Sequence, residues 1–123
     1  MRSVRKIQPD CVLSIHQNSY PEEAIHGAQV FYYEDSSEGK KLAEILQKHL
    51  VEVLDKENHR QAKGNRTYYM LKKTEATLVI VECGFLSNNQ EALLLTDEKY
   101  QNKVAKAICS GTLEYLSSLA EKK

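Results

Sequence analysis

The sequence has no excess of charge and no long apolar run, and each absence excludes a class of protein. Its 17 basic and 17 acidic residues cancel, so the electrostatic signature of a nucleic-acid-binding protein is missing. No apolar run approaches the roughly 18 residues that cross a bilayer. The first residues, Met1 to Lys6, are not followed by the apolar stretch of an export signal. The sequence therefore predicts no nucleic-acid partner and no transmembrane segment, and it shows no export signal.

Paired cysteines, internal repeats and linkers are also lacking. The three cysteines, Cys11, Cys83 and Cys109, are odd in number and have no CxxC spacing. Neither a disulfide framework nor a cysteine zinc site is indicated, and we expect small buried apolar residues instead. A length of 123 residues fits one ordinary domain. A single domain over residues 1–123 is expected.

Short apolar runs alternate with segments of helical periodicity along the chain. Apolar, β-branched and aromatic runs predict strands at residues 10–16, 27–33 and 77–82. Apolar spacing and N-cap residues predict helices at residues 42–54, 88–95 and 96–116. The last strand is apolar on both faces, as in a helix-covered sheet. This order predicts an α/β fold with a layered, mostly parallel sheet and helices on both faces.

Two polar residues follow directly on buried strands, His16 after the first strand and Glu82 after the third. In open α/β sheets the ligand crevice lies outside the carboxyl ends of the strands, so parallel strands would bring these side chains to one site. A histidine and a glutamate there suit a metal ligand and a general base. The alternative for His16 is a hydrogen-bonded residue at a strand boundary. Glu82 continues an apolar run, and a buried carboxylate needs a metal, a cation or a proton.

The other histidines carry weaker signals. His26 precedes Gly27 near the loop after His16 and is either close to the site or an exposed loop residue. His49 lies on the expected helix without an HExxH pattern, and His59 lies in a polar loop, so neither is assigned to a metal.

Cys83 raises the alternative of a nucleophilic cysteine activated by a histidine. No histidine occurs after His59, and the residue two before Cys83 is Val81, so the Gly-x-nucleophile-x-Gly elbow is absent. Both facts argue against a catalytic thiol.

Two motifs carry a family resemblance. Residues 14–18, SIHQN, resemble the SIHxN segment of zinc-dependent N-acetylmuramoyl-L-alanine amidases of type 3, and residues 81–88, VECGFLSN, resemble their VExGFxSN segment. The likeness runs from about Val4 to Leu116. The cysteine in the second motif and the paired tyrosines at 68 and 69 are most similar to the germination-specific spore-cortex branch.

The resemblance implies a role for each matching residue. His16 would be the second zinc-binding histidine and Glu82 the catalytic glutamate. Asn18, which lies in the first motif, and His26, which lies near the loop after His16, are candidates for substrate binding. The implied reaction is zinc-assisted hydrolysis, in peptidoglycan, of the amide between muramic acid and L-alanine. A full-length protein of this kind would act outside the cell, at the cell wall.

The departure from the family pattern concerns the zinc ligands. The family's first zinc histidine lies in a GHGG segment and a zinc glutamate follows it, and neither segment occurs in this sequence. A catalytic zinc site uses three protein ligands, so this chain is expected to hold an incomplete site. We therefore expect a partial catalytic domain that lacks its N-terminal part, is inactive alone and self-associates through an exposed sheet edge. The alternative is a non-catalytic remnant that binds peptidoglycan or a partner protein, and a third possibility is an unrelated α/β domain.

Overall fold

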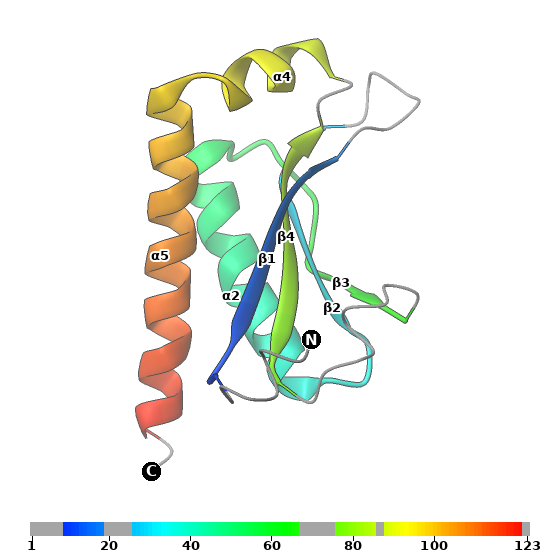
Figure 1. Cartoon of the computed structure of the whole chain (residues 1–123), viewed down its shortest axis with the longest axis vertical. Coiled ribbons are helices and arrows are strands. Elements are labelled where there is room, and N and C mark those ends of the chain that lie inside the picture. The colour runs from blue at the N-terminus through cyan, green and yellow to red at the C-terminus, as the bar shows by residue number, and fades with distance from the viewer. Residues whose placement is uncertain (1–8, 19–25, 67–75, 86–87, 122–123) are drawn as a thin grey trace.

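The computed structural model describes residues 9–18, 26–66, 76–85 and 88–121. Its strands and helices are interspersed along the chain (Figure 1). They are, in order, β1 (Val12–Asn18), β2 (Gln29–Tyr33), α2 (Ser37–Leu54), β3 (Lys63–Asn65), β4 (Leu78–Phe85), α4 (Asn89–Leu95) and α5 (Glu98–Glu121). All six expected elements are present. The short strand β3 was not predicted, because its three residues, Lys-Gly-Asn, have no β-branched or aromatic side chain.

The described strands form one mixed sheet in the order β1-β4-β2-β3. Strands β1 and β4 are parallel, and so are β2 and β3, whereas β2 and β4 are antiparallel. The expectation of a layered, mostly parallel α/β sheet is confirmed. Within the described residues β1 is an outer strand of this sheet.

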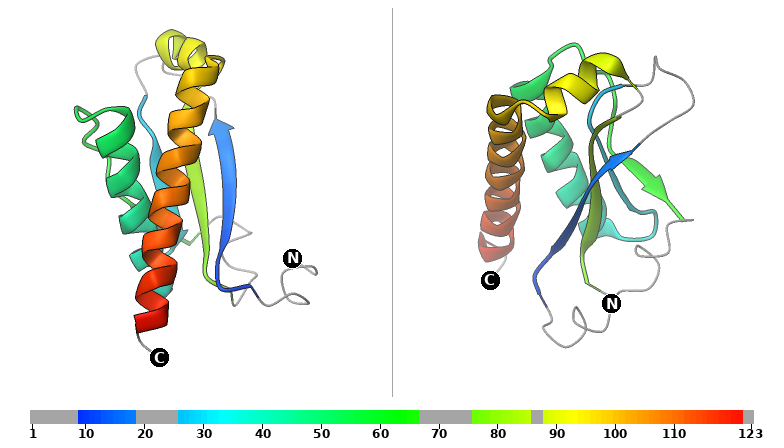
Figure 2. Two further views of the ribbon diagram at one scale, coloured as in Figure 1. Left: turned by 90° about the vertical axis from the view of Figure 1, so that its left-hand side faces the viewer. Right: turned by 45° about the horizontal axis from the view of Figure 1, so that its top comes forward.

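Alternate side chains of β1, β2 and β4 enter two separate apolar clusters. Val79 and Val81 of β4 and Val30 of β2 join the main core with α2 and α5. Leu78 and Ile80 of β4 form a smaller cluster on the opposite face, with Val12, Phe31 and Tyr33 packed against it. Both long helices therefore cover the same face of the sheet (Figure 2). The described part of the chain places no helix on the other face, where the sequence led us to expect one as well.

The two long helices approach each other closely near Gly111. On α2 the buried positions recur at helical spacing, at Leu42, Ala43, Leu46 and Leu50, and on α5 at Val104, Ala107, Gly111 and Tyr115. A Cβ atom on Gly111 would lie 2.8 Å from Leu46 Cδ2 and 3.4 Å from Leu46 Cα. The missing side chain lets the backbones of α2 and α5 pack together, which secures the helical layer behind the sheet.

Side chains cap the starts of two helices. Ser36 Oγ accepts a hydrogen bond of 2.9 Å from Gly39 N at the start of α2, and Asn88 Oδ1 accepts one of 3.1 Å from Glu91 N at the start of α4. These bonds satisfy amide groups that have no partner within the helix. None of the described helices is both long and apolar enough to traverse a membrane.

Candidate functional site

His16 and Glu82 stand side by side on neighbouring parallel strands. They are direct register partners in the pairing of β1 with β4, so their backbones lie at the usual spacing of about 4.8 Å. Residues paired in this way point to the same face of a sheet. Both strands continue past them, to Asn18 and Phe85, with an irregularity in the register between His16 and Asn18. The sequence had indicated that the two residues follow the strands. They lie instead within the strands, near the carboxyl end of each.

Glu82 is fully buried, with no exposed surface. Its Oε1 accepts a hydrogen bond of 3.3 Å from Gly84 N. Alternation along β4 places Glu82 on the face of Leu78 and Ile80, away from the helices. The register irregularity follows Glu82, and a Cβ on Gly84 would lie 3.2 Å from Leu95 Cδ1 and 3.3 Å from Glu91 Oε1 of α4. A carboxylate in this position is compatible with the role of a general base.

His16 is exposed, and its ring is held by its own strand. Ser14 Oγ lies 2.7 Å from His16 Nε2. The two residues are two positions apart on β1, so their side chains share a face. The sequence did not single out Ser14, although its position two residues before a candidate ligand was a usable signal.

Gln29 extends the row of side chains across a third strand. It is the register partner of Glu82 in the antiparallel pairing of β2 with β4. Its amide is fixed at both ends, since Nε2 donates to Gln61 O at 2.8 Å and Oε1 accepts from Arg60 Nη1 at 2.9 Å. His16, Glu82 and Gln29 thus form one row on one face of the sheet. Only the register reveals Gln29, because nothing in its sequence context points to a site.

Two side chains from other parts of the chain form hydrogen bonds with the backbone just before β2, next to this row. Arg60 Nε donates to His26 O at 2.7 Å, and Glu91 Oε2 on α4 accepts from Gly27 N at 2.7 Å. Gly27 has a φ of 97°, which is in the left-handed region that favours glycine. Glu91 also contributes to the environment of Tyr100, whose pKa is raised to about 12, first by burial and then by this carboxylate. These contacts fix the chain entering the site, and sequence reasoning missed both Arg60 and Glu91.

The two candidates for substrate binding are only partly placed. Asn18 ends β1, and its side chain lies outside the described residues. His26 is exposed and precedes the antiparallel strand that pairs with Glu82, so it lies toward the same end of the sheet. The roles of both residues stay predictions.

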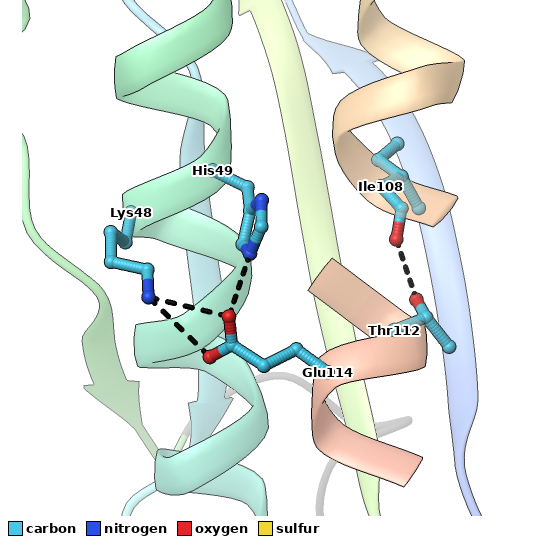
Figure 3. A network of polar contacts seen from close by, with 5 residues as sticks. All are labelled: Lys48, His49, Ile108, Thr112 and Glu114. Atoms are coloured by element: carbon cyan, nitrogen blue, oxygen red, sulfur yellow. Dashed lines mark hydrogen bonds and ion pairs between the residues drawn. The ribbon is translucent and has the colours of Figure 1, made fainter. Parts of the chain in front are cut away.

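His49 belongs to the interface between the two long helices. Its Nε2 lies 3.1 Å from Glu114 Oε1, and Lys48 Nζ reaches both carboxylate oxygens of Glu114 at 3.4 Å (Figure 3). The helices stand on the face of the sheet opposite Glu82. His59 is exposed and lines a groove of about 710 Å³ between α2 and residues 58–62, which includes neither His16 nor Glu82. Both histidines thus lie away from the row that holds His16 and Glu82, and their exclusion from the metal site stays a prediction.

Cys83 points away from His16. It is buried in the main core on the helix side of the sheet, because it follows Glu82 on an alternating strand. Burial, and secondarily the neighbouring Glu82, raise the pKa of its thiol to about 11. A thiol with such a pKa stays protonated at neutral pH and is a poor nucleophile. The alternative of a catalytic cysteine finds no support in this arrangement.

Side chains that could bind a metal are not clustered in the described part of the chain. Residues 9–18, 26–66, 76–85 and 88–121 contain no group of three or more histidine, cysteine, aspartate or glutamate side chains placed to hold an ion. At the site, His16 and the buried carboxylate of Glu82 stand side by side on one face of the sheet. What this arrangement offers is one nitrogen donor beside one proton acceptor.

Known proteins resemble this chain in sequence and in fold. The germination-specific N-acetylmuramoyl-L-alanine amidase of Bacillus subtilis is 35% identical over 117 residues, which cover 95% of this chain and 49% of that protein. The CwlD amidase of Clostridioides difficile, solved in complex with the GerS lipoprotein, superimposes with a TM-score of 0.85 at 43% identity, over 89% of this chain and 55% of that one. An N-acetylmuramoyl-L-alanine amidase from Clostridium difficile 630 has a TM-score of 0.87 at 27% identity, over 95% and 63%.

These similarities identify the family, but they cover only part of each relative's length. The chain spans about half or less of the curated relatives, for example 49% of the protein from B. subtilis and 38% of the probable cell wall amidase LytH of Staphylococcus epidermidis. The family model described as N-acetylmuramoyl-L-alanine amidase matches residues 1–114. The two motifs around His16 and Glu82 lie within that match. The chain belongs to the N-acetylmuramoyl-L-alanine amidase family, and its resemblance to the germination-specific branch is confirmed.

Proposed function

We propose that this chain forms part of the catalytic domain of a peptidoglycan hydrolase, which cleaves the amide between N-acetylmuramic acid and L-alanine. The observation that carries the proposal is the register pairing of His16 with Glu82 on parallel strands, in a chain of the amidase family. Peptidoglycan lies outside the cytoplasmic membrane, so we infer that the complete protein acts at the cell wall.

The donor set fits a zinc site in part. Zinc takes imidazole nitrogen and carboxylate oxygen as ligands, and catalytic zinc uses three protein ligands. His16 is exposed on the site face and suits one of these positions. Because the described residues contain no group of three candidate ligands, we propose that the others belong to the part of the relatives' length that this chain does not span.

Glu82 suits the role of general base and acid. When bound, zinc supplies Lewis-acid polarisation of the scissile carbonyl and makes water more acidic. The carboxylate of Glu82 takes the proton of the attacking water and delivers it to the nitrogen of L-alanine as the amide bond breaks. Burial of Glu82, with Oε1 held by Gly84 N, keeps this proton carrier in one orientation. Proton transfer of this kind contributes about 10²–10⁴-fold to rate.

The row of His16, Glu82 and Gln29 spans three strands, and we propose that it forms the floor of the substrate-binding site. Asn18 and His26 lie toward the same end of the sheet and are proposed to contact the glycan or the peptide. The contacts of Arg60 and Glu91 with residues 26–29 hold one side of this floor in place.

The first experiment tests catalysis in a complete domain. In the B. subtilis relative, the 117-residue matching segment is replaced by this chain, and release of peptide from peptidoglycan is measured. We expect activity in the folded chimera and a loss of at least about 100-fold after Glu82→Gln, which keeps the shape of the side chain but removes the base. A folded chimera that is inactive, or one that keeps its activity after Glu82→Gln, would overturn the proposal.

A second experiment needs no chimera. The chain has four histidines, and their ring signals are followed by NMR while zinc is added to the purified chain. We expect the His16 signals to respond at the lowest zinc concentration, with His26, His49 and His59 as internal controls. A response of the other three without His16 would contradict its assignment as a ligand.

The non-catalytic alternative is decided by the same materials. A module that only binds peptidoglycan or a partner would bind insoluble peptidoglycan as tightly after Glu82→Gln as before, and its chimera would stay inactive. Self-association through β1, an outer strand of the described sheet, also stays a prediction. Size-exclusion chromatography at several protein concentrations tests it directly.

A further inference from the structure

The hydrogen bond between Ser14 and His16 determines which ring nitrogen of His16 is left for a ligand. Ser14 Oγ lies 2.7 Å from His16 Nε2, within one strand and on the same face as Glu82. An imidazole has two nitrogens, and a nitrogen engaged by a hydroxyl group cannot bind a metal at the same time. The contact therefore leaves Nδ1 as the nitrogen that can coordinate.

The direction of the hydrogen bond follows from what coordination requires. A coordinating nitrogen must present its lone pair, so the proton of the neutral ring has to sit on the other nitrogen. Metal-binding histidines usually donate this second N–H to an oxygen of the protein, which fixes both the tautomer and the ring orientation. A serine hydroxyl group can accept such a bond.

We propose that Ser14 is a positioning residue for the metal site: its Oγ accepts the Nε2–H of His16 and so presents Nδ1 to the zinc ion. The proposal rests on the proposed role of His16, which it deepens. His16 is exposed, so without the hydrogen bond to Ser14 its ring would rotate among several orientations before a metal binds. Holding it in advance lowers the entropy lost when the metal binds.

A purely structural role for Ser14 predicts a different result. A hydrogen bond at an exposed strand position contributes to the stability of β1 but has no effect on which nitrogen binds a metal. The two roles are therefore separated by the coordinating atom and by the metal affinity, whatever happens to stability.

The experiment compares the chain with Ser14→Ala and with the matched control Ser14→Thr, which keeps a hydroxyl group. In ¹⁵N-labelled, metal-free protein, we expect a hydrogen-bonded Nε2–H signal of His16 in the unchanged chain and in Ser14→Thr, and its loss in Ser14→Ala. On addition of zinc, the ¹⁵N shift should move at Nδ1. The affinity should fall about tenfold or more in Ser14→Ala and stay within a few-fold in Ser14→Thr.

Each outcome has a distinct meaning. Coordination through Nε2 in the unchanged chain, or equal zinc affinity in Ser14→Ala, would overturn the role of Ser14 while leaving His16 as a ligand. If no His16 nitrogen responds to zinc, the proposed function loses its metal ligand, and the inference about Ser14 falls with it. If Ser14→Ala fails to fold, the Nε2–H signal and the coordinating atom in the unchanged chain still decide the matter.

Discussion

Gln47 on α2 takes the place of a neighbouring strand at Val30 of β2. Its Oε1 accepts a hydrogen bond of 2.8 Å from Val30 N, and its Nε2 donates one of 3.0 Å to Ala28 O. β3 pairs with β2 only from Phe31 onward, so the preceding backbone groups need other partners. The buried amide of Gln47 supplies them, and it ties the helical layer to the strand that flanks Glu82.

Replacing Gln47 with leucine is therefore expected to destabilise the fold. Val30 N would stay buried without this acceptor, which costs about 1–3 kcal/mol of unfolding free energy. Ala28 O would keep the 3.0 Å hydrogen bond from Asn58 Nδ2. Removing the bond from Gln47 to Ala28 O should therefore cost less unfolding free energy than removing the bond to Val30 N. Urea unfolding followed by circular dichroism measures the effect, and the exposed Glu44→Leu on the same helix is the control. Equal stability of the two variants would show that the amide of Gln47 is dispensable.

Gly111 tests the close packing of α2 on α5. In Gly111→Val the new Cβ would meet Leu46 Cδ2 at 2.8 Å, and Leu46 is itself fully buried. We expect a loss of roughly 1–3 kcal/mol from overpacking. Ser110→Val is the matched control, because it adds the same side chain at an exposed position of the same helix. If thermal unfolding shows equal losses in both variants, helix propensity rather than packing explains the effect.

The three cysteines should differ in reactivity because they differ in exposure. Cys109 is exposed, Cys11 is half-buried and Cys83 is buried, and the pKa of Cys83 is raised to about 11. With a thiol reagent at neutral pH, we expect Cys109 to react first in the folded chain and Cys83 to react only on unfolding. Cys109→Ser should remove the fast phase. A fast phase that survives this change, and disappears in Cys83→Ala, would revive the idea of a reactive thiol beside Glu82.

Much of the fold was predictable because apolar patterning reports burial locally. The run before Glu82 and the helical spacing from Leu42 to Leu54 each identified their element, and both are confirmed as β4 and α2. Strand ends were placed too early. His16 and Glu82 are polar and were taken as the ends of strands, whereas the backbone pairing continues through them.

The parts that could not be predicted depend on contacts between distant residues. The direction of β2 against β4, and hence the approach of Gln29 to Glu82, follows from the path of the whole chain. Arg60 reaches His26 across 34 positions of sequence, and Glu91 reaches Gly27 across 64. No local pattern marks such partners. His16 and Glu82 were found because each directly follows a buried apolar run and lies in a family motif, and their roles still await the experiments above.

The contact of Glu114 with His49 and Lys48 predicts a pH-dependent link between the long helices. The pKa of Glu114 is lowered from its ordinary value of 4.5, first by the hydrogen bond from His49 and then by Lys48. A carboxylate with a depressed pKa stabilises the fold above its unfolded pKa, and this contribution is lost as the pH falls through the folded pKa. Glu114→Gln should therefore unfold at a lower temperature than the unchanged chain at neutral pH, by a small amount because the pair is exposed.

At a pH below the folded pKa of Glu114 the two midpoints should converge, since the carboxyl group is then neutral in both states of the unchanged chain. Thermal unfolding at a series of pH values measures the convergence. Introducing Glu114→Gln into a His49→Gln background provides the control, because the effect of the second change should shrink if the two side chains interact. A midpoint difference that is the same at every pH, and undiminished in the His49→Gln background, would mean that the charge of Glu114 does not link α2 to α5.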